Sequence, residues 1–214
     1  MTPRYPVLLD LADRDCLVVG GGVVAERKVR GLLAVDARVT VIAPTATDEL
    51  ARLAAQGELR WERRTYRADV VETRALGVDR WWFVATATHD PDLNAAIASV
   101  ATSAGIWAND ASASDGGAVA LPAVDRRGAL TLAVSTGGAH PGAAAWLRDL
   151  ASGAIGPEHL TALSLADEVR AESASGARPD WRQAVDSGML DLIREGHVAE
   201  AKERLKACLS SSSD

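Results

Sequence analysis

A short apolar run that ends in three consecutive glycines is the feature that most constrains the fold. Residues 16–19 are apolar at every position, as expected for a strand that is buried on both faces of a parallel sheet. Gly20, Gly21 and Gly22 follow directly, and residues 23–35 then show the apolar spacing of an amphipathic helix. A strand, a glycine-rich turn and a helix in this order predict the start of a βαβ unit.

Strand-like and helix-like runs continue to alternate up to residue 110. The strand-like runs are residues 39–43, 59–66, 82–85 and 106–108, and the helical runs are residues 48–55 and 92–104. Strands that alternate with helices predict parallel pairing and right-handed crossovers. We therefore expect an α/β fold in which residues 1–111 form an N-terminal domain with a Rossmann-type parallel sheet.

The pattern changes after residue 110. Residues 110–117 are rich in Ser, Asp and Gly, as is typical of a loop. Two strand-like runs follow at residues 118–124 and 129–136, and residues 125–128 between them predict a hairpin turn. The rest of the chain has helical character. We expect a small β element over residues 112–145, a C-terminal helical domain over residues 146–209, and a tail over residues 210–214.

The glycine turn fits the pattern G-x-G-x-x-G/A, which favours a dinucleotide ligand. Gly20 allows a tight turn, Gly22 allows backbone N–H groups to approach a pyrophosphate, and Ala25 allows close packing of helix on strand. The helix N-terminus adds a favourable dipole for the anion. The acid that usually holds the ribose about 20 residues further on is absent, since Pro44 and Thr45 stand there. Local chemistry therefore leaves NAD and NADP open.

Composition and charge exclude several classes of protein. The formal net charge is -6, whereas proteins that bind nucleic acid without sequence preference are usually basic. No run approaches the roughly 18 apolar residues that a membrane-spanning helix needs, and Asp10 and Asp13 interrupt the apolar stretch of a signal peptide. Cys16 and Cys208 are too few for a disulfide framework or a cysteine-based zinc site. We expect a cytoplasmic protein with neither nucleic acid nor membrane as partner.

Four segments carry a more specific signature. They are residues 13–28 with the glycine turn, residues 85–90 with Asn94, residues 106–109, and residues 132–141 with the following Leu147 and Arg148. In order and spacing they resemble the siroheme synthase N-terminal family of precorrin-2 dehydrogenases, many of which are also sirohydrochlorin ferrochelatases. The resemblance covers residues 3–150 well and the remaining residues only by their helical character.

The resemblance implies an enzyme of siroheme biosynthesis that oxidises precorrin-2 to sirohydrochlorin with NAD as cofactor. In such a protein, residues 1–111 bind NAD, residues 112–145 form the dimerisation element of a homodimer, and the later helices cover a tetrapyrrole site between subunits. Ferrous iron is then a possible second substrate, and no permanent metal site is implied. A chain of 214 residues leaves no room for a fused methyltransferase, so it resembles the stand-alone type.

Cofactor and substrate contacts follow from the resemblance by position. Those assigned to the cofactor are Gly20, Gly22, Val23, Val24, Pro44, Thr45, Ala87 and Thr88. Those assigned to the substrate are Asn109, Thr136, Gly137, Gly138 and Arg148. Because the substrate is a polycarboxylate, an acidic chain needs local cations, and Arg126 and Arg127 are further candidates. The charged residues at positions 26–28 and 30 are expected on a solvated helix face.

The catalytic position departs from the family, which generally carries Asn-x-x-Asp after the fifth strand. Here Asn109 is followed by Ser112 at the position of the acid, and a serine hydroxyl does not ionise near neutrality. Asp110 or Asp115 can take over the role if the backbone shifts. Alternatively, dehydrogenation needs no carboxylate and chelation is impaired, or activity is altered or lost. His140, in the glycine-rich signature, is a further candidate for proton transfer or iron contact.

Two other functions remain open. The first is a metal chelatase that acts on sirohydrochlorin with weak or no dehydrogenase activity. The second is a non-catalytic NAD-binding module, which Ser112 favours. The loop at residues 110–117 and the signature at residues 137–141 argue against that module, because a sensor of NAD needs no second ligand site.

Overall fold

The computed structural model describes residues 4–67, 80–113, 117–172 and 178–210. The chain divides into two compact units. The first unit comprises Met1–Pro122 and Ser135–Pro141, and the second comprises Ala123–Val134 and Gly142–Asp214. The predicted domain boundaries at residues 111 and 145 stay a prediction.

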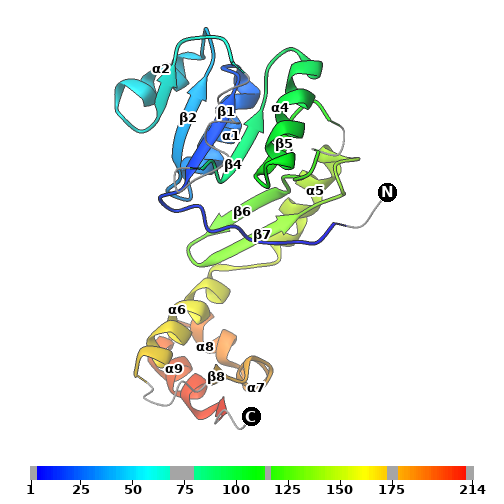
Figure 1. Cartoon of the computed structure of the whole chain (residues 1–214). Helices are drawn as coiled ribbons and strands as arrows, with labels where there is room; N and C mark the ends of the chain where they lie inside the picture. The colour runs from blue at the N-terminus through cyan, green and yellow to red at the C-terminus, as the bar shows by residue number, and fades with distance from the viewer. Residues whose placement is uncertain (1–3, 68–79, 114–116, 173–177, 211–214) are drawn as a thin grey trace. The chain divides into compact units, whose positions relative to one another are not determined.

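The first unit contains a five-stranded parallel sheet with the strand order β3-β2-β1-β4-β5 (Figure 1). Its strands are β1 (Asp15–Val19), β2 (Arg38–Ile42), β3 (Arg60–Glu62), β4 (Phe83–Thr86) and β5 (Trp107–Asp110). The predicted α/β fold with a Rossmann-type sheet is confirmed. The direction of strand addition reverses between β1 and β4, and open α/β sheets bind ligands outside the carboxyl ends of the strands at such a point.

Helices cover both faces of this sheet because alternate side chains of each strand point to opposite sides. Cys16 and Val18 of β1 pack in one apolar cluster with α1 (Val23–Leu33) and α2 (Asp48–Ala55). Leu17 and Val19 pack in a second cluster with α4 (Pro91–Ser103). Residues at the strand ends therefore face either the α1 side or the α4 side, according to their position in the strand.

The second unit combines a β-hairpin with helices. The hairpin is formed by β6 (Ala123–Arg127) and β7 (Leu130–Val134). The helices are α5 (Pro141–Gly153), α6 (Pro157–Glu172), α7 (Trp181–Asp186), α8 (Met189–Arg194) and α9 (Val198–Ala207), and the short strands β8 (Arg178–Pro179) and β9 (Leu209–Ser210) pair with each other. Leu165, Val169, Met189 and Leu205 are among the buried residues of its core.

The hairpin turn differs from the sequence-based expectation. Arg127 pairs with Leu130, so the turn is Gly128 and Ala129 rather than residues 125–128. Gly128 has φ +57°, a left-handed conformation that favours glycine. The first strand begins at Ala123 rather than residue 118 because Val119 belongs to the first unit, where its backbone N–H donates to the Ala108 carbonyl over 3.0 Å.

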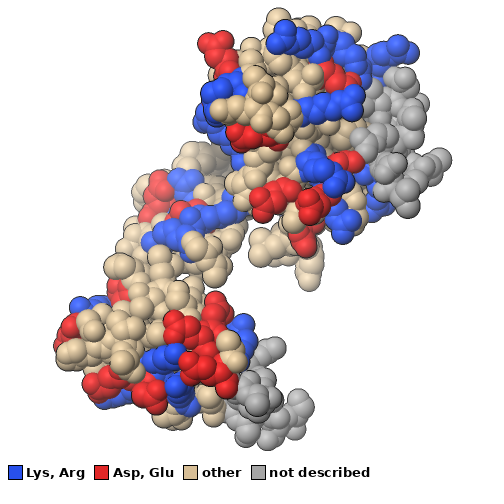
Figure 2. Space-filling model, turned by 90° about the vertical axis from the view of Figure 1, so that its left-hand side faces the viewer, with Lys and Arg blue, Asp and Glu red and all other residues tan. Residues whose placement is uncertain are grey.

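Within the described ranges, no helix combines the length and apolar character that crossing a bilayer requires. Acidic and basic side chains are interspersed on the face of each unit that Figure 2 presents, without a broad basic surface in that view. Anionic groups of a ligand must therefore be met by individual cations or by backbone N–H groups rather than by a basic patch on that face.

Candidate functional site

The glycine turn after β1 is pressed tightly between two neighbouring loops. Gly20 has φ +126°, and a Cβ atom there would lie 2.3 Å from the Ala87 carbonyl oxygen. A Cβ atom on Gly21 would lie 2.0 Å from the Thr45 carbonyl oxygen. Side chains are therefore excluded at both positions, and the turn joins the loops that follow β2 and β4 at the carboxyl edge of the sheet.

Gly22 is different, because a Cβ atom there would meet no protein atom within 4 Å. It precedes the first residue of α1, which begins without a side-chain cap, so the backbone N–H groups of the first turn point outward. The side chains of Val23 and Val24 are exposed. Open space beside uncapped N–H groups at a positive helix end fits the pyrophosphate of a dinucleotide.

The loop after β2 is fastened to this turn. The Thr47 N–H donates to the Gly21 carbonyl over 2.9 Å, and the Thr47 hydroxyl donates to Glu26 over 2.8 Å. Glu26 also pairs with Arg30 at 2.7 Å and is only 15% exposed, so the expectation of a fully solvated helix face is wrong at Glu26. Pro44 and Thr45 are exposed beside the turn. Their predicted contact with a cofactor stays a prediction.

A buried polar network lies at the carboxyl ends of β4 and β5. Asp110 is 5% exposed, and its Oδ1 accepts hydrogen bonds from the Ser112 N–H at 2.8 Å and from the Ser112 hydroxyl at 2.6 Å. Asn94 of α4 donates to the Ser112 hydroxyl over 3.4 Å and binds Thr88, the residue two positions after β4. Asp110 and Ser112, both predicted catalytic residues, are therefore in direct contact.

Thr86 lies beside Asp110 at the end of the sheet but its side chain takes no part in this network. The two residues are partners in the register of β4 and β5, so their side chains point to the same face of the sheet. Thr86 is fully buried, and its hydroxyl has no hydrogen-bond partner among the described residues. Buried hydroxyls normally have a hydrogen-bond partner, so a buried hydroxyl without one is more typical of a functional site than of a packed core, and it lies at the Asp110 end of β5.

Lys28 is a site residue that sequence analysis missed. It lies on α1, where its ammonium donates to the Asn109 side-chain oxygen, and Asn109 in turn donates to the Val119 carbonyl over 2.6 Å. Burial, together with the nearby charge of Arg27, lowers the pKa of Lys28 from 10.5 to about 8, while Asp110 opposes this shift. The expectation that Lys28 lies on a solvated face is therefore wrong, and the nucleotide helix is tied directly to β5.

The glycine-rich signature forms a closed loop. The Thr136 hydroxyl donates to the His140 carbonyl at 3.0 Å and accepts from the His140 N–H at 3.2 Å. Gly137 and Gly138 have positive φ, and the His140 side chain is exposed. The roles of these residues in substrate binding and proton transfer stay predictions. Asp115, the other predicted acid, lies outside the described residues.

The arginines of the hairpin and α5 have different surroundings. Arg127 donates to the carbonyls of Ser152 and Ile155, at 3.0 and 2.7 Å, and so caps the C-terminal end of α5. Arg148 pairs with the adjacent Asp149 at 2.6 Å and is partly exposed, so it can exchange that carboxylate for one of a substrate. Arg126 is exposed. Arg127 is therefore already committed to the fold. Arg148 has one long bond of 3.4 Å to the Val124 carbonyl besides its pairing with Asp149, so Arg126 and the Asp149-bound side of Arg148 can meet a ligand.

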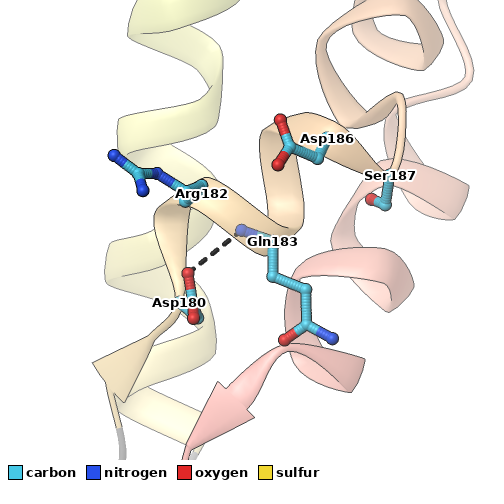
Figure 3. A pocket seen from close by; sticks show the side chains of 5 residues that line it. All are labelled: Asp180, Arg182, Gln183, Asp186 and Ser187. Atoms are coloured by element: carbon cyan, nitrogen blue, oxygen red, sulfur yellow. Dashed lines mark hydrogen bonds between the residues drawn. The ribbon is translucent and has the colours of Figure 1, made fainter.

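Two further features concern ligands. No cluster of three or more His, Cys, Asp or Glu side chains suited to a metal ion occurs among the described residues. The second unit has an open hollow of about 470 Å³ along α7, lined by Asp180, Arg182, Gln183, Asp186 and Ser187 (Figure 3). There Asp180 accepts from the Gln183 N–H at 3.0 Å, which caps the short helix. None of the predicted site residues lines this hollow.

Known proteins resemble the chain along most of its length. It is 32% identical to a siroheme synthase of Nitrosomonas europaea over 98% of this chain and 44% of that protein. It is 39% identical to a precorrin-2 dehydrogenase of Priestia megaterium over 64% of each protein. The solved structure of SirC, a precorrin-2 dehydrogenase, matches with a TM-score of 0.66 and 28% identity, and covers 96% of this chain and 98% of that one.

These similarities confirm the resemblance predicted from the four signature segments between residues 13 and 148. The chain spans less than half the length of the siroheme synthases it matches. A family described as "Putative NAD(P)-binding" matches residues 7–123, which are more than half of the chain and include the glycine turn, Asn94 and Asp110. The chain belongs to this putative NAD(P)-binding family.

Proposed function

We propose that this chain oxidises precorrin-2 to sirohydrochlorin with NAD as hydride acceptor. The observation that carries this proposal is the pairing of an open glycine cradle with a buried carboxylate at the same sheet edge. Gly22 leaves space beside uncapped N–H groups, and Asp110 ends a strand two places away in the sheet. The similarity to precorrin-2 dehydrogenases supports this choice of substrate.

The chain's own residues bind the dinucleotide, orient the substrate and accept a proton. NAD supplies a carbon that accepts the hydride, which carries two electrons and one proton away from the macrocycle. The first turn of α1 binds the dinucleotide pyrophosphate through backbone N–H groups. A second proton leaves the macrocycle, and Asp110 accepts it on Oδ2, the oxygen that Ser112 does not bind. Asp110 then releases the proton to solvent.

Contacts to the substrate carboxylates are proposed for the loop at residues 136–138 and for Arg148. Thr136 holds the loop closed, so the backbone around Gly137 and Gly138 keeps one shape. Arg148 offers a planar, permanently charged group suited to a carboxylate. Asn109, tied to Lys28, belongs to the same proposed set of substrate contacts.

A homodimer is part of the proposal, and an exposed apolar stripe on α5 supports it. Trp146 is 63% exposed and Leu150 is 61% exposed, one helical turn apart on the same face. Large apolar side chains at this spacing are suited to packing against a second copy. We expect Trp146→Glu to convert the dimer to monomers in analytical ultracentrifugation. Trp181→Glu, at another exposed tryptophan, serves as the control and should remain dimeric; a monomeric wild type would contradict the dimer.

The cytoplasm is the proposed location. Cys16 and Cys208 are both buried free thiols, and burial raises the pKa of Cys16 to about 12, which keeps it unreactive. Free buried cysteines are compatible with a reducing compartment.

Anaerobic incubation of the purified chain with precorrin-2 and either NAD or NADP tests the function. We expect sirohydrochlorin and NADH to form in equal amounts, and omission of the dinucleotide should stop the reaction. Ferrous iron added afterwards tests the second proposed activity, iron insertion, in which Asp110 accepts pyrrole protons. Iron insertion into separately supplied sirohydrochlorin, without any oxidation of precorrin-2, would favour the chelatase, and dinucleotide binding without either reaction would favour a non-catalytic module.

A further inference from the structure

Asn94 occupies a central position in the polar network, although sequence analysis gave it no role. It lies in the first half of α4 and is 1% exposed. Its Oδ1 accepts from the Thr88 N–H at 3.0 Å and from the Thr88 hydroxyl at 2.8 Å. Its Nδ2 donates to the Thr88 carbonyl at 3.2 Å and to the Ser112 hydroxyl at 3.4 Å. All four hydrogen-bonding sites of this buried amide are therefore used.

The orientation of the Asn94 amide is fixed by its partners. A backbone N–H can only donate, so the atom that accepts from the Thr88 N–H must be the amide oxygen. The other atom is then the NH₂ group, which must donate to Ser112. Because the Ser112 oxygen accepts there, its single proton is directed to Asp110 at 2.6 Å. A carboxylate can only accept, so the hydrogen bond runs from Ser112 to Asp110, and the donation from Asn94 leaves the Ser112 proton free for it.

The same amide connects two segments of the proposed site. Thr88 belongs to the loop after β4, to which a cofactor contact is assigned, and Ser112 belongs to the loop after β5. Asn94 joins them through its side chain alone. Both donors of Ser112 go to Oδ1 of Asp110, and Oδ2 accepts no hydrogen bond from a described residue.

We propose that Asn94 is a positioning residue for proton transfer: it holds the Ser112 hydroxyl on Oδ1 of Asp110 and so presents Oδ2 to the substrate. This inference rests on the proposed oxidation of precorrin-2. Asn94 acts through Ser112 and touches neither substrate nor cofactor in this role. A substitution that loses the donation to Ser112 but keeps the acceptor for Thr88 should therefore reduce the rate of the chemical step and leave dinucleotide affinity unchanged.

Asn94→Asp is the informative substitution because it preserves shape and the acceptor for Thr88. A carboxylate at position 94 cannot donate to Ser112 and instead competes with Asp110 for the Ser112 proton. We expect kcat to fall about 10-fold, with the Kd for NAD within about 2-fold of wild type. Ser112→Ala should lower kcat to a similar extent. The double variant should be no slower than Ser112→Ala alone, because both changes break one chain of hydrogen bonds.

Independent effects would overturn the proposal: kcat losses that multiply in the double variant, or an Asn94→Asp protein with wild-type kcat. Asn94→Ala also removes the donor to Ser112 and replaces Asn94→Asp if that variant does not fold; the expectation for kcat and for the double variant is the same, whereas the Kd for NAD is compared only in Asn94→Asp, which keeps the acceptor for Thr88. A crystal structure of Asn94→Asp gives a readout that does not need turnover. The Ser112 hydroxyl should lie within hydrogen-bond distance of residue 94 and away from Asp110. If the wild-type protein does not oxidise precorrin-2, the proposed function is wrong. The crystal structure of Asn94→Asp then decides on its own whether Asn94 positions the Ser112 hydroxyl.

Discussion

Replacing Asp110 with Asn is expected to lower kcat for precorrin-2 oxidation by about 100-fold, in the range typical for loss of a general base. The substitution keeps the shape of the side chain, and the Asn oxygen can still accept both bonds from Ser112. It replaces Oδ2, the proposed proton acceptor, with an NH₂ group that cannot accept a proton. Stopped-flow absorbance of the macrocycle at saturating NAD measures the effect, and the Kd for NAD should not change.

Two control variants make this experiment specific. Asp92→Asn removes an exposed acid from the first turn of α4 and should retain wild-type kcat, which excludes a general effect of charge. Asp115→Asn tests the alternative acid. If Asp110→Asn retains more than half of wild-type kcat while Asp115→Asn does not, the proton acceptor is Asp115. If both variants are fully active, dehydrogenation needs no carboxylate.

Replacing Lys28 with Met is expected to stabilise the fold most at neutral pH. Burial lowers the pKa of Lys28 from 10.5 to about 8, so below pH 8 the folded protein carries a poorly solvated charge. A shift of this size corresponds to about 3 kcal/mol of destabilisation. Between pH 8 and 10.5 the folded state loses this proton while the unfolded state retains it, so the wild type gains stability as pH rises.

The difference in unfolding free energy between Lys28→Met and wild type should therefore shrink by about 3 kcal/mol from pH 7 to pH 10.5. Urea unfolding followed by tryptophan fluorescence measures it. A neutral amine can still donate to Asn109, so the change between the two pH values reports mainly the loss of the Lys28 charge in the folded state. Lys206→Met is the control, since the pKa of Lys206 is raised by its bonds to Glu203 and Glu172, and its contribution stays constant over this range. A pH-independent difference for Lys28→Met would show that Lys28 is well solvated.

The parallel sheet could be predicted from the sequence because the apolar patterns of its strands and helices each lie within a short segment. The apolar run before Gly20 and the helix spacing after it identify β1 and α1 without any long-range information. The helix predicted at residues 48–55 matches α2, where the Thr47 hydroxyl accepts from the Leu50 N–H as an N-cap. The hairpin turn was misplaced because residues 125–128 have turn-like composition, whereas Asp125 and Arg127 are strand residues that bind Ser152 of the helix α5.

The polar network could be predicted only in part, because its bonds join distant segments. Asp110 and Ser112 are two residues apart, and their neighbourhood was clear from the sequence. Lys28 and Asn109 are 81 positions apart, and only the fold brings them together. One signal was available: Lys28 lies three residues after Ala25 and four before Leu32, both buried residues of α1. A lysine on that face needed a buried partner.

Titration of the purified chain with NAD by calorimetry, together with Gly22→Val, tests most directly whether a dinucleotide lies at the start of α1. Gly22 has an ordinary extended conformation and open space around it, so Val should not disturb the fold. Gly31→Ala adds a Cβ to open space further along the same helix and serves as the matched control. We expect one NAD per chain, at least a 10-fold weaker Kd for Gly22→Val, and no change for Gly31→Ala. Wild type that binds no NAD or NADP, or binding that Gly22→Val leaves intact, would contradict the account.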